Sequence, residues 1–266
     1  MVFPDVPPLD AHAHIATDVT MDQVRRLGGA VILAVTRDLS EAATVPFGCY
    51  PTLIWGVGVH PRNGSGLAAY SGERFNALLP RFALVGEVGL DHRAGQLATQ
   101  RQVFSDILAR TGDNPVITSI HSTGVAGEVV SLLAQHKVRA PVLHWFGGSV
   151  EEIRQAAEIG AWFSVNAAME HKRIVAMPVE RVLTETDFPY TRRVGSHRPG
   201  ATEPVEQRLA EAWGCPAGLV RRRIWDNFKC LVTASGAKAR LPRPVQARVS
   251  LLVPASRDAA SPQDSY

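Results

Sequence analysis

The chain has 266 residues, of which 45% are hydrophobic and 20% are charged, proportions that suit a globular protein with a sizeable core. Its 28 Lys and Arg residues against 25 Asp and Glu residues give a formal charge of only +3. These values exclude disorder as the general state of the chain, and the charge alone is too small to indicate an anionic partner.

The cysteines and the apolar runs indicate in which cellular compartment the protein resides. Three cysteines without a CxxC spacing argue against a disulfide framework and a zinc knuckle. No apolar run approaches the roughly 20 residues that cross a bilayer, and the first residues lack the basic and apolar pattern of a secretion signal. We expect a cytoplasmic protein without a membrane partner.

Short apolar runs rich in β-branched residues alternate with helix-like stretches, a pattern typical of parallel strands joined by helices. Helical spacing marks residues 96–110 and 127–136, Ser149 begins a helix that stops at Gly160, and residues 203–213 and those from Pro216 onward also indicate helices. The predicted strands cover residues 6–11, 30–35, 53–59, 82–86, 115–120, 141–144, 161–165 and 181–185.

This succession predicts a single α/β domain with a (β/α)8 TIM-type barrel over residues 1–238. Residues 239–266 contain four prolines and no clear period, and we expect a partly irregular C-terminal tail there. Within this tail, Leu251, Leu252 and Val253 are candidates for docking on the barrel.

Two histidines, His12 and His14, stand two residues apart at the end of the first predicted strand. Alternation along a strand points both imidazoles to the same side, where they can hold one metal ion. A pair of surface or capping histidines explains this motif alone equally well.

Further potential ligands follow other predicted strands, and this repetition favours a metal-binding site over a pair of surface histidines. In a barrel the carboxyl ends of all strands converge on one face. Four imidazoles and two carboxylates exceed what one four-coordinate ion needs, so we expect two divalent ions, Mg²⁺, Mn²⁺ or Zn²⁺. Glu87 is the natural bridge between them. The predicted ligands are His12, His14, Glu87, His121, His144 and Asp187.

Other candidates stay open at this point. His60 also ends a predicted strand and either contacts substrate or steadies a loop before Pro61. Asp91 is best explained as a helix cap. The basic stretch 192–198 follows Asp187 and is either a cationic rim for phosphates or a solvated loop.

Taken together, these motifs resemble the TatD-type metal-dependent nucleases of the amidohydrolase-like barrel superfamily. The resemblance spans residues 9 to about 230. It rests on DAHAH at 10–14, GVHP at 58–61, GEVGLD at 86–91, IHS at 120–122, HWFGG at 144–148 and TETDFPY at 184–190.

The resemblance implies hydrolysis of DNA phosphodiesters, often from a single-stranded end. It implies one metal ion on His12, His14, Glu87 and Asp187 and a second on Glu87, His121 and His144. Three residues are implied to be catalytic. Asp187 would orient or deprotonate the attacking water, Glu87 would bridge the ions, and His60 would lie beside the scissile phosphate.

Two features set this chain apart from the general family. Residues 122–124 lack the arginine and the acid that tend to follow the fifth-strand histidine, so a substrate contact is missing or supplied elsewhere. Residues 144–149 and 162–169 look closer to the TatD-like component of Qat anti-phage defence systems, which implies partner proteins of the Qat type and a role in defence.

Two other functions remain. A small-molecule hydrolase, such as a lactonase, amidase or phosphotriesterase, uses the same ligands, although no lysine follows a predicted strand to serve as a carboxylated bridge. A non-catalytic subunit of a larger complex is the other, and the complete ligand set argues against it.

Overall fold

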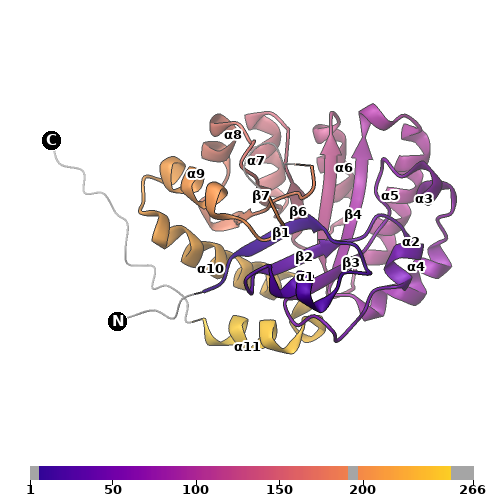
Figure 1. The fold of residues 1–266 in the computed structure, drawn as a ribbon. Helices are drawn as coiled ribbons and strands as arrows, with labels where there is room; N and C mark the ends of the chain where they lie inside the picture. The colour runs from indigo at the N-terminus through magenta and orange to yellow at the C-terminus, as the bar shows by residue number, and fades with distance from the viewer. Residues whose placement is uncertain (1–5, 191–196, 253–266) are drawn as a thin grey trace.

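A ring of parallel strands forms the centre of the computed structural model, which describes residues 6–190 and 197–252 (Figure 1). The strands pair in chain order from first to last, and every pair is parallel. They are β1 (Leu9–His14), β2 (Val31–Val35), β3 (Leu53–Val57), β4 (Leu84–Asp91), β5 (Ile117–Thr123), β6 (Pro141–His144), β7 (Trp162–Val165) and β8 (Val182–Thr184). The predicted TIM-type fold is therefore confirmed.

The ring closes between β1 and the residues after β8 rather than through a full ladder. The backbone N–H of Asp187 donates to the carbonyl of His12 at 2.9 Å, and that of His14 donates to Phe188 at 2.9 Å. The segment that carries Asp187 is thereby held against the end of β1.

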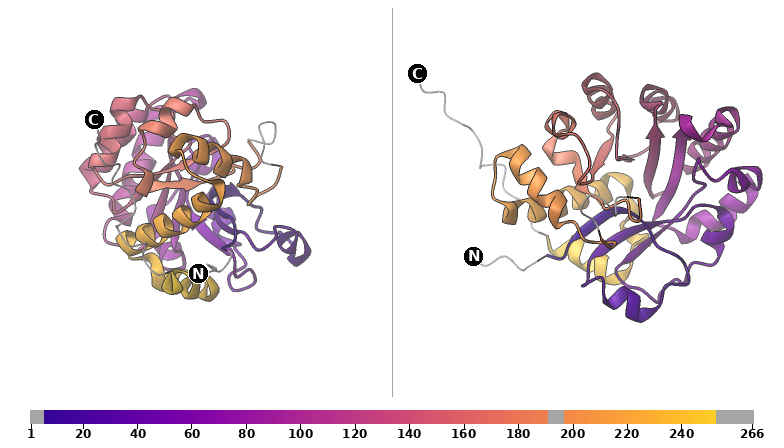
Figure 2. Two further views of the ribbon diagram at one scale, coloured as in Figure 1. Left: turned by 90° about the vertical axis from the view of Figure 1, so that its left-hand side faces the viewer. Right: turned by 45° about the horizontal axis from the view of Figure 1, so that its top comes forward.

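Helices cover the outside of the ring (Figure 2). Local signals explain several of them: Ser149 and Glu152 form a capping box at the start of α7, and Gly160 follows its end with φ +87°. The helices are α1 (Met21–Arg25), α2 (Leu39–Ala43), α3 (Gly64–Ala68), α4 (Gly72–Leu78), α5 (Leu97–Thr111), α6 (Ala126–His136), α7 (Val150–Glu158), α8 (His171–Ala176), α9 (Glu203–Trp213), α10 (Ala217–Ser235) and α11 (Arg243–Leu251).

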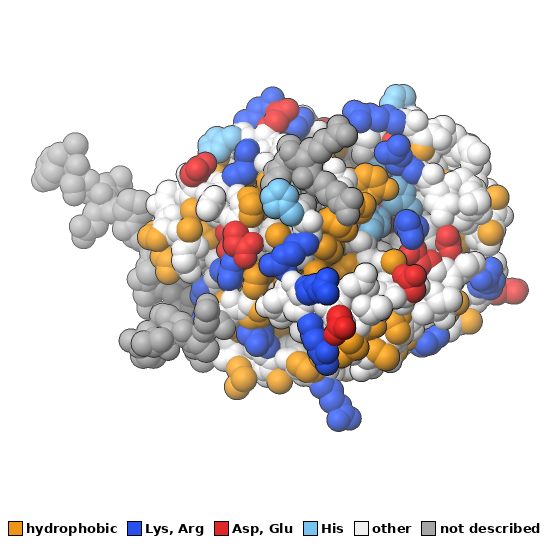
Figure 3. Space-filling model, viewed as in Figure 1, with side chains coloured by type: hydrophobic (Ala, Val, Ile, Leu, Met, Phe, Trp, Pro, Cys, Tyr) orange, Lys and Arg blue, Asp and Glu red, His pale blue; other side chains and the backbone are white. Residues whose placement is uncertain are grey.

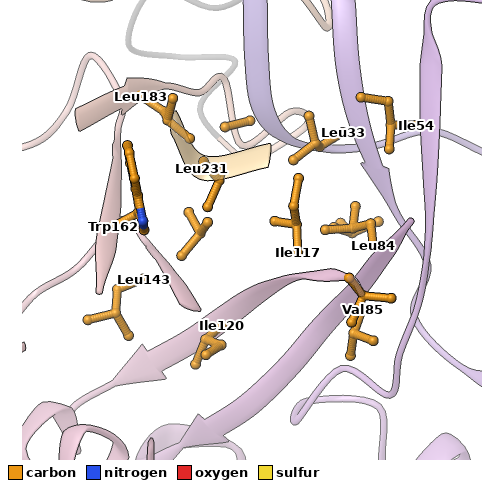
Figure 4. Close-up of a cluster of buried hydrophobic side chains, with 14 of the residues drawn as sticks. Leu33, Ile54, Leu84, Val85, Ile117, Ile120, Leu143, Trp162, Leu183 and Leu231 are labelled. Carbon is orange, nitrogen blue, oxygen red and sulfur yellow. The ribbon is translucent and has the colours of Figure 1, made fainter. Parts of the chain in front are cut away.

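Helix α10 closes the end of the barrel opposite the predicted site. Trp225 is fully buried and its indole N–H donates to the carbonyl of Pro7, ahead of β1, at 2.7 Å. Leu231 lies among interior side chains such as Leu33 and Leu183 (Figure 4). Apolar burial of this kind makes the base of the barrel a packed core rather than a channel.

Three strands run further than the apolar pattern predicts. Strand β1 ends at His14, β4 at Asp91 and β5 at Thr123, each several residues beyond the end of the apolar run. Backbone pairing does not require apolar side chains, so the ladder continues through the polar residues. Glu87 and His121 therefore lie within strands rather than just after them.

The C-terminal stretch also differs from the prediction, because residues 243–251 form helix α11, which lies beside α10 (Figure 1). Prolines at its first positions suit a helix start, and Val245 and Val249 form a buried stripe one turn apart. Leu252 docks, Leu251 is 81% exposed, and Val253 lies outside the described residues. The domain boundary at residue 238 stays a prediction.

None of the helices in residues 6–190 and 197–252 has the length and apolar character needed to cross a membrane.

Candidate metal centre

Strand β1 brings three polar side chains to one side of the sheet because they alternate along it. Asp10 and His12 are fully buried, and His14 is partly buried nearer the strand end. Asp10 accepts hydrogen bonds from the N–H of Thr186 at 2.8 Å, from its hydroxyl at 2.6 Å and from the N–H of Gly200 at 2.8 Å. It joins β1 to the chain on both sides of Asp187.

Glu87 lies at the middle of the site, where the pairing of β4 with β5 is irregular between Val85 and Val88. Irregularities of this kind re-aim side chains at functional sites. The backbone N–H of Glu87 donates to the carbonyl of Thr36 at 3.1 Å, beyond the end of β2. The buried carboxylate is therefore held by its own backbone in the centre of the ring.

One oxygen of Glu87, Oε2, faces three imidazoles. It lies 3.5 Å from His12 Nε2, 3.1 Å from His14 Nε2 and 3.2 Å from His60 Nε2. The other ring nitrogen of His12 lies 2.8 Å from the hydroxyl of Ser119. Burial lowers the pKa of His60 to about 4, which leaves its ring neutral near pH 7. These three histidines are hereafter the Oε2 side of the centre.

The other oxygen, Oε1, faces two imidazoles, hereafter the Oε1 side. It lies 2.7 Å from His121 Nδ1 and 2.8 Å from His144 Nε2. Each ring has a carboxylate behind it: Asp91 Oδ2 lies 3.1 Å from His121 Nε2, and Glu185 Oε1 lies 3.9 Å from His144 Nδ1. Partners of this kind fix the orientation of a metal-binding histidine.

Asp187 completes the site from the segment after β8. Its Oδ1 lies 3.9 Å from His12 Nε2, and the residue is 4% exposed. Its backbone has φ +45°, a left-handed conformation that Asp tolerates better than most residues. Strain of this kind is concentrated at functional sites.

The electrostatics of the centre favour a bound cation. Burial would raise the pKa of Glu87, but the surrounding imidazoles, His60 first among them, hold it well below its usual range. Burial would lower the pKa of His144, yet Glu87 and Glu185 raise it well above. Burial, aided by Glu185 and Glu87, raises the pKa of Asp187 to about 8. Ionisation of Asp187 near pH 7 thus calls for added positive charge.

Buried atoms without partners point the same way. Within the described residues, both ring nitrogens of His14, Nε2 of His12 and Oε2 of Glu87 have no hydrogen bond of suitable geometry. Such atoms are rare unless water or an ion satisfies them. Ligand atoms within 4.8 Å of one another form three overlapping groups: His12, His14 and Asp187; His12, Glu87 and His144; His14, His60 and Glu87.

The centre opens into a cleft of about 600 Å³. Arg62, Arg93 and Arg173 line it, together with the exposed aromatic side chains of Trp145 and Tyr190. Figure 3 shows histidine side chains on this face with Lys and Arg side chains around them. The cleft can therefore admit an anionic ligand to the buried carboxylates.

A second cleft of about 710 Å³ adjoins the first and shares His60, Arg62 and Tyr190 with it. Its charge is mixed, because Arg37 is bonded to Glu41 at 2.9 Å. Tyr190 therefore stands between two spaces, and Arg93 lines only the one over the metal centre.

The structure brings all seven predicted site residues together, and their roles as ligands or catalysts stay predictions. His60 lies as near to Glu87 as His14 does, so it is also a candidate ligand. Asp91 caps the following turn by accepting from the N–H of Arg93 at 2.7 Å, as predicted, and contacts His121 as well. Most of the basic stretch 192–198 lies outside the described residues.

Sequence reasoning missed the residues behind the ligands. Glu185 and Ser119 each stand two positions before a predicted ligand, and alternation along a strand could have placed them on the same side. Glu185 is held by the hydroxyl of Ser164 and by Asn166, whose side-chain N–H donates at 3.0 Å. These polar contacts have no signature in the apolar pattern.

A family model described as TatD related DNase matches residues 9–233. The chain belongs to this family. Membership in the TatD family confirms the predicted resemblance and the predicted class of enzyme, a TatD-like metal-dependent hydrolase. The closer likeness to the Qat component stays a prediction.

Two bacterial TatD proteins are similar in sequence. The uncharacterized metal-dependent hydrolase TatD of Mycobacterium tuberculosis is 28% identical over 263 residues, which cover 86% of this chain and 96% of that protein. The 3'-5' ssDNA/RNA exonuclease TatD of Klebsiella pneumoniae is 29% identical over 157 residues, which cover 54% of this chain and 58% of that protein.

Solved structures show the same fold. YjjV, a TatD homologue from Escherichia coli, superimposes with a TM-score of 0.73 at 21% identity, over 84% of this chain and 96% of that one. A TatD family hydrolase from Entamoeba histolytica gives 0.67 at 15% identity, over 85% and 97%.

Proposed function

We propose that this protein hydrolyses phosphodiester bonds of DNA with two divalent ions, Mg²⁺, Mn²⁺ or Zn²⁺, held on either side of Glu87. The observation that carries the proposal is that each carboxylate oxygen of Glu87 faces its own set of imidazoles. A carboxylate in this position can bridge two ions. Besides Glu87, the proposed ligands are His12 and His14 of the Oε2 side, joined there by Asp187, and His121 and His144 of the Oε1 side.

When bound, the ions supply the positive charge that activates water and offsets the charge developing on the phosphate. Asp187 orients the attacking water and accepts its proton, and His60 contacts the scissile phosphate. Arg93 lines the same cleft and supplies positive charge that the stretch 122–124 lacks. Hydrogen bonds and charge from these side chains hold the substrate in line with the water.

The substrate we propose is DNA with a free, single-stranded end. Support comes from the arginine-lined cleft and from a relative named as an exonuclease of single-stranded DNA and RNA. To test this, metal-stripped protein is given back each ion in turn with end-labelled single-stranded and double-stranded DNA, and Glu87→Ala serves as control.

Cleavage by the wild type alone is the expected result. Absence of cleavage with every ion would contradict the proposal and favour a small-molecule substrate or an enzyme that needs a partner.

We also propose a role in anti-phage defence in the cytoplasm, together with other proteins of a Qat-type system. Its support is the resemblance of residues 144–149 and 162–169 to the TatD-like component of those systems. Co-expression with Qat-type partners should protect cells from phage, and Glu87→Ala should remove that protection. Equal protection by the variant would contradict a role for the hydrolase in defence.

A further inference from the structure

Trp145 directly follows the candidate ligand His144, yet the proposed mechanism gives it no role. Its side chain is 36% exposed and lines the cleft over the metal centre. The residues on either side are buried, His144 at 4% and Phe146 at 0% exposure. A large indole is thus displayed to the substrate space from between two anchored neighbours.

The backbone at Trp145 is held in an unfavourable conformation. It has φ +37°, in the left-handed region that a bulky residue rarely adopts. Its N–H donates to the carbonyl of Ser164 at 3.2 Å, and Arg173 Nε donates to the carbonyl of Gly148 at 3.0 Å. Phe146 packs against Phe163, with ring centroids 5.9 Å apart. These contacts keep the indole facing the cleft.

The cleft around Trp145 suits a nucleotide. Tyr190, which is 58% exposed, lines the same space, and its ring lies edge-on to that of His14 at 5.5 Å. Arg93 forms no ion pair with another described residue, so its guanidinium is available to a phosphate. An exposed aromatic face beside cationic side chains is the combination that binds single-stranded nucleic acid.

We propose that Trp145 is a stacking platform for the unpaired base at the end of the DNA strand whose phosphodiester occupies the metal centre. This inference rests on the proposed nuclease function and assigns to that site the residue that selects single-stranded ends. In a duplex the terminal base is already stacked and paired, so it must be released before it can reach the indole. Stacking accepts any base, so the platform itself imposes no sequence preference.

The test compares wild type, Trp145→Gly and Trp145→Phe on two single-stranded oligonucleotides, one ordinary and one abasic at the end that the wild type attacks. Glycine adopts the left-handed conformation freely, so Trp145→Gly removes the ring without straining the backbone. Leu219→Ala, an exposed apolar position on α10 that lines neither cleft, is the matched control.

We expect Trp145→Gly to raise KM for the ordinary strand about tenfold, within the range that one base–aromatic stack covers. Trp145→Phe should stay within about threefold, because a ring remains. On the abasic strand, wild type and Trp145→Gly should have the same KM. The control should match wild type on both strands.

Two results overturn the platform: equal KM for wild type and Trp145→Gly on the ordinary strand, or equal losses on both strands, which would show that Trp145 only positions the loop. If the wild type cuts neither strand while it hydrolyses another substrate, the proposed nuclease function is wrong. The proposal that Trp145 stacks on a DNA base is then wrong as well.

Discussion

The two sides of the metal centre share Glu87 but differ in what lies behind their histidines. On the Oε2 side, the outer nitrogen of His12 meets the hydroxyl of Ser119 at 2.8 Å. On the Oε1 side, the outer nitrogens of both rings face carboxylates, Asp91 at 3.1 Å and Glu185 at 3.9 Å. The hydroxyl is neutral, whereas the carboxylates carry charge.

Under the proposed two-ion arrangement, this difference makes the two sites that share Glu87 unequal. A carboxylate behind an imidazole raises its basicity and tightens its hold on a metal ion. Burial and His144 lower the pKa of His12, whereas Glu87 and Glu185 raise that of His144 against the effect of burial. We therefore expect the Oε1 side to bind its ion tightly and the Oε2 side to exchange its ion beside the substrate.

The largest effect is expected from Glu87→Gln, which removes the feature that the two sides share. Loss of one ion's charge stabilisation amounts to several kcal/mol, so kcat/KM should fall at least about a thousandfold. Steady-state hydrolysis with each ion checks this, and circular dichroism should report a folded barrel. Retention of activity within tenfold would show that Glu87 is not the bridge.

Glu185→Gln and Asp91→Asn should reduce the difference in metal affinity between the two sides. Each removes a charge behind a ring of the Oε1 side, and such partners contribute about 10- to 100-fold to metal affinity. Isothermal titration should show weakening of the tighter ion by that factor while the weaker ion is little changed. If only the weaker ion responds, the order of affinity that we infer for the two sides is reversed.

The fold and the gathering of the candidate ligands in one place were predictable because both depend on local patterns. Apolar runs marked the strands, and side chains with metal-binding chemistry recurred near their carboxyl ends, as Glu87 and Asp187 do. Convergence of these ends in a barrel then placed distant residues together without any further information.

What escaped prediction depends on contacts between distant segments. Asp10 meets Thr186 and Gly200 across 176 and 190 residues, and a single sequence carries no mark of either contact. The left-handed backbone of Trp145 is set by its buried neighbours rather than by its own preference. Strand β4 continues beyond its apolar run for the same reason, because its backbone stays paired with that of β5.

Proton release on metal binding should report the charge states of the ligands on the two sides. The pKa of His144 is raised well above its usual value, so at pH 7 the metal-free protein carries a proton there that a cation must expel. The pKa of His12 is lowered well below 6.5, so its ring is already neutral. Calorimetry at pH 7 in buffers of different ionisation enthalpy should find at least about one proton released from the imidazoles with the tighter ion, and about one from the carboxyl of Asp187, whose pKa is raised to about 8, with the weaker. Release with neither would contradict the charge state assigned to the Oε1 side.

The smallest effect is expected from Ser119→Ala, which removes the neutral partner of His12. A neutral hydrogen bond contributes about 0.5–1.5 kcal/mol, so the affinity of the weaker ion should fall about two- to tenfold while the tighter ion is unchanged. Ser131→Ala, at an exposed position of α6, is the control. If Ser119→Ala instead weakened the tighter ion, His12 would be a ligand of the tighter ion. The groups behind the histidines would then not explain why the two sites that share Glu87 differ in affinity.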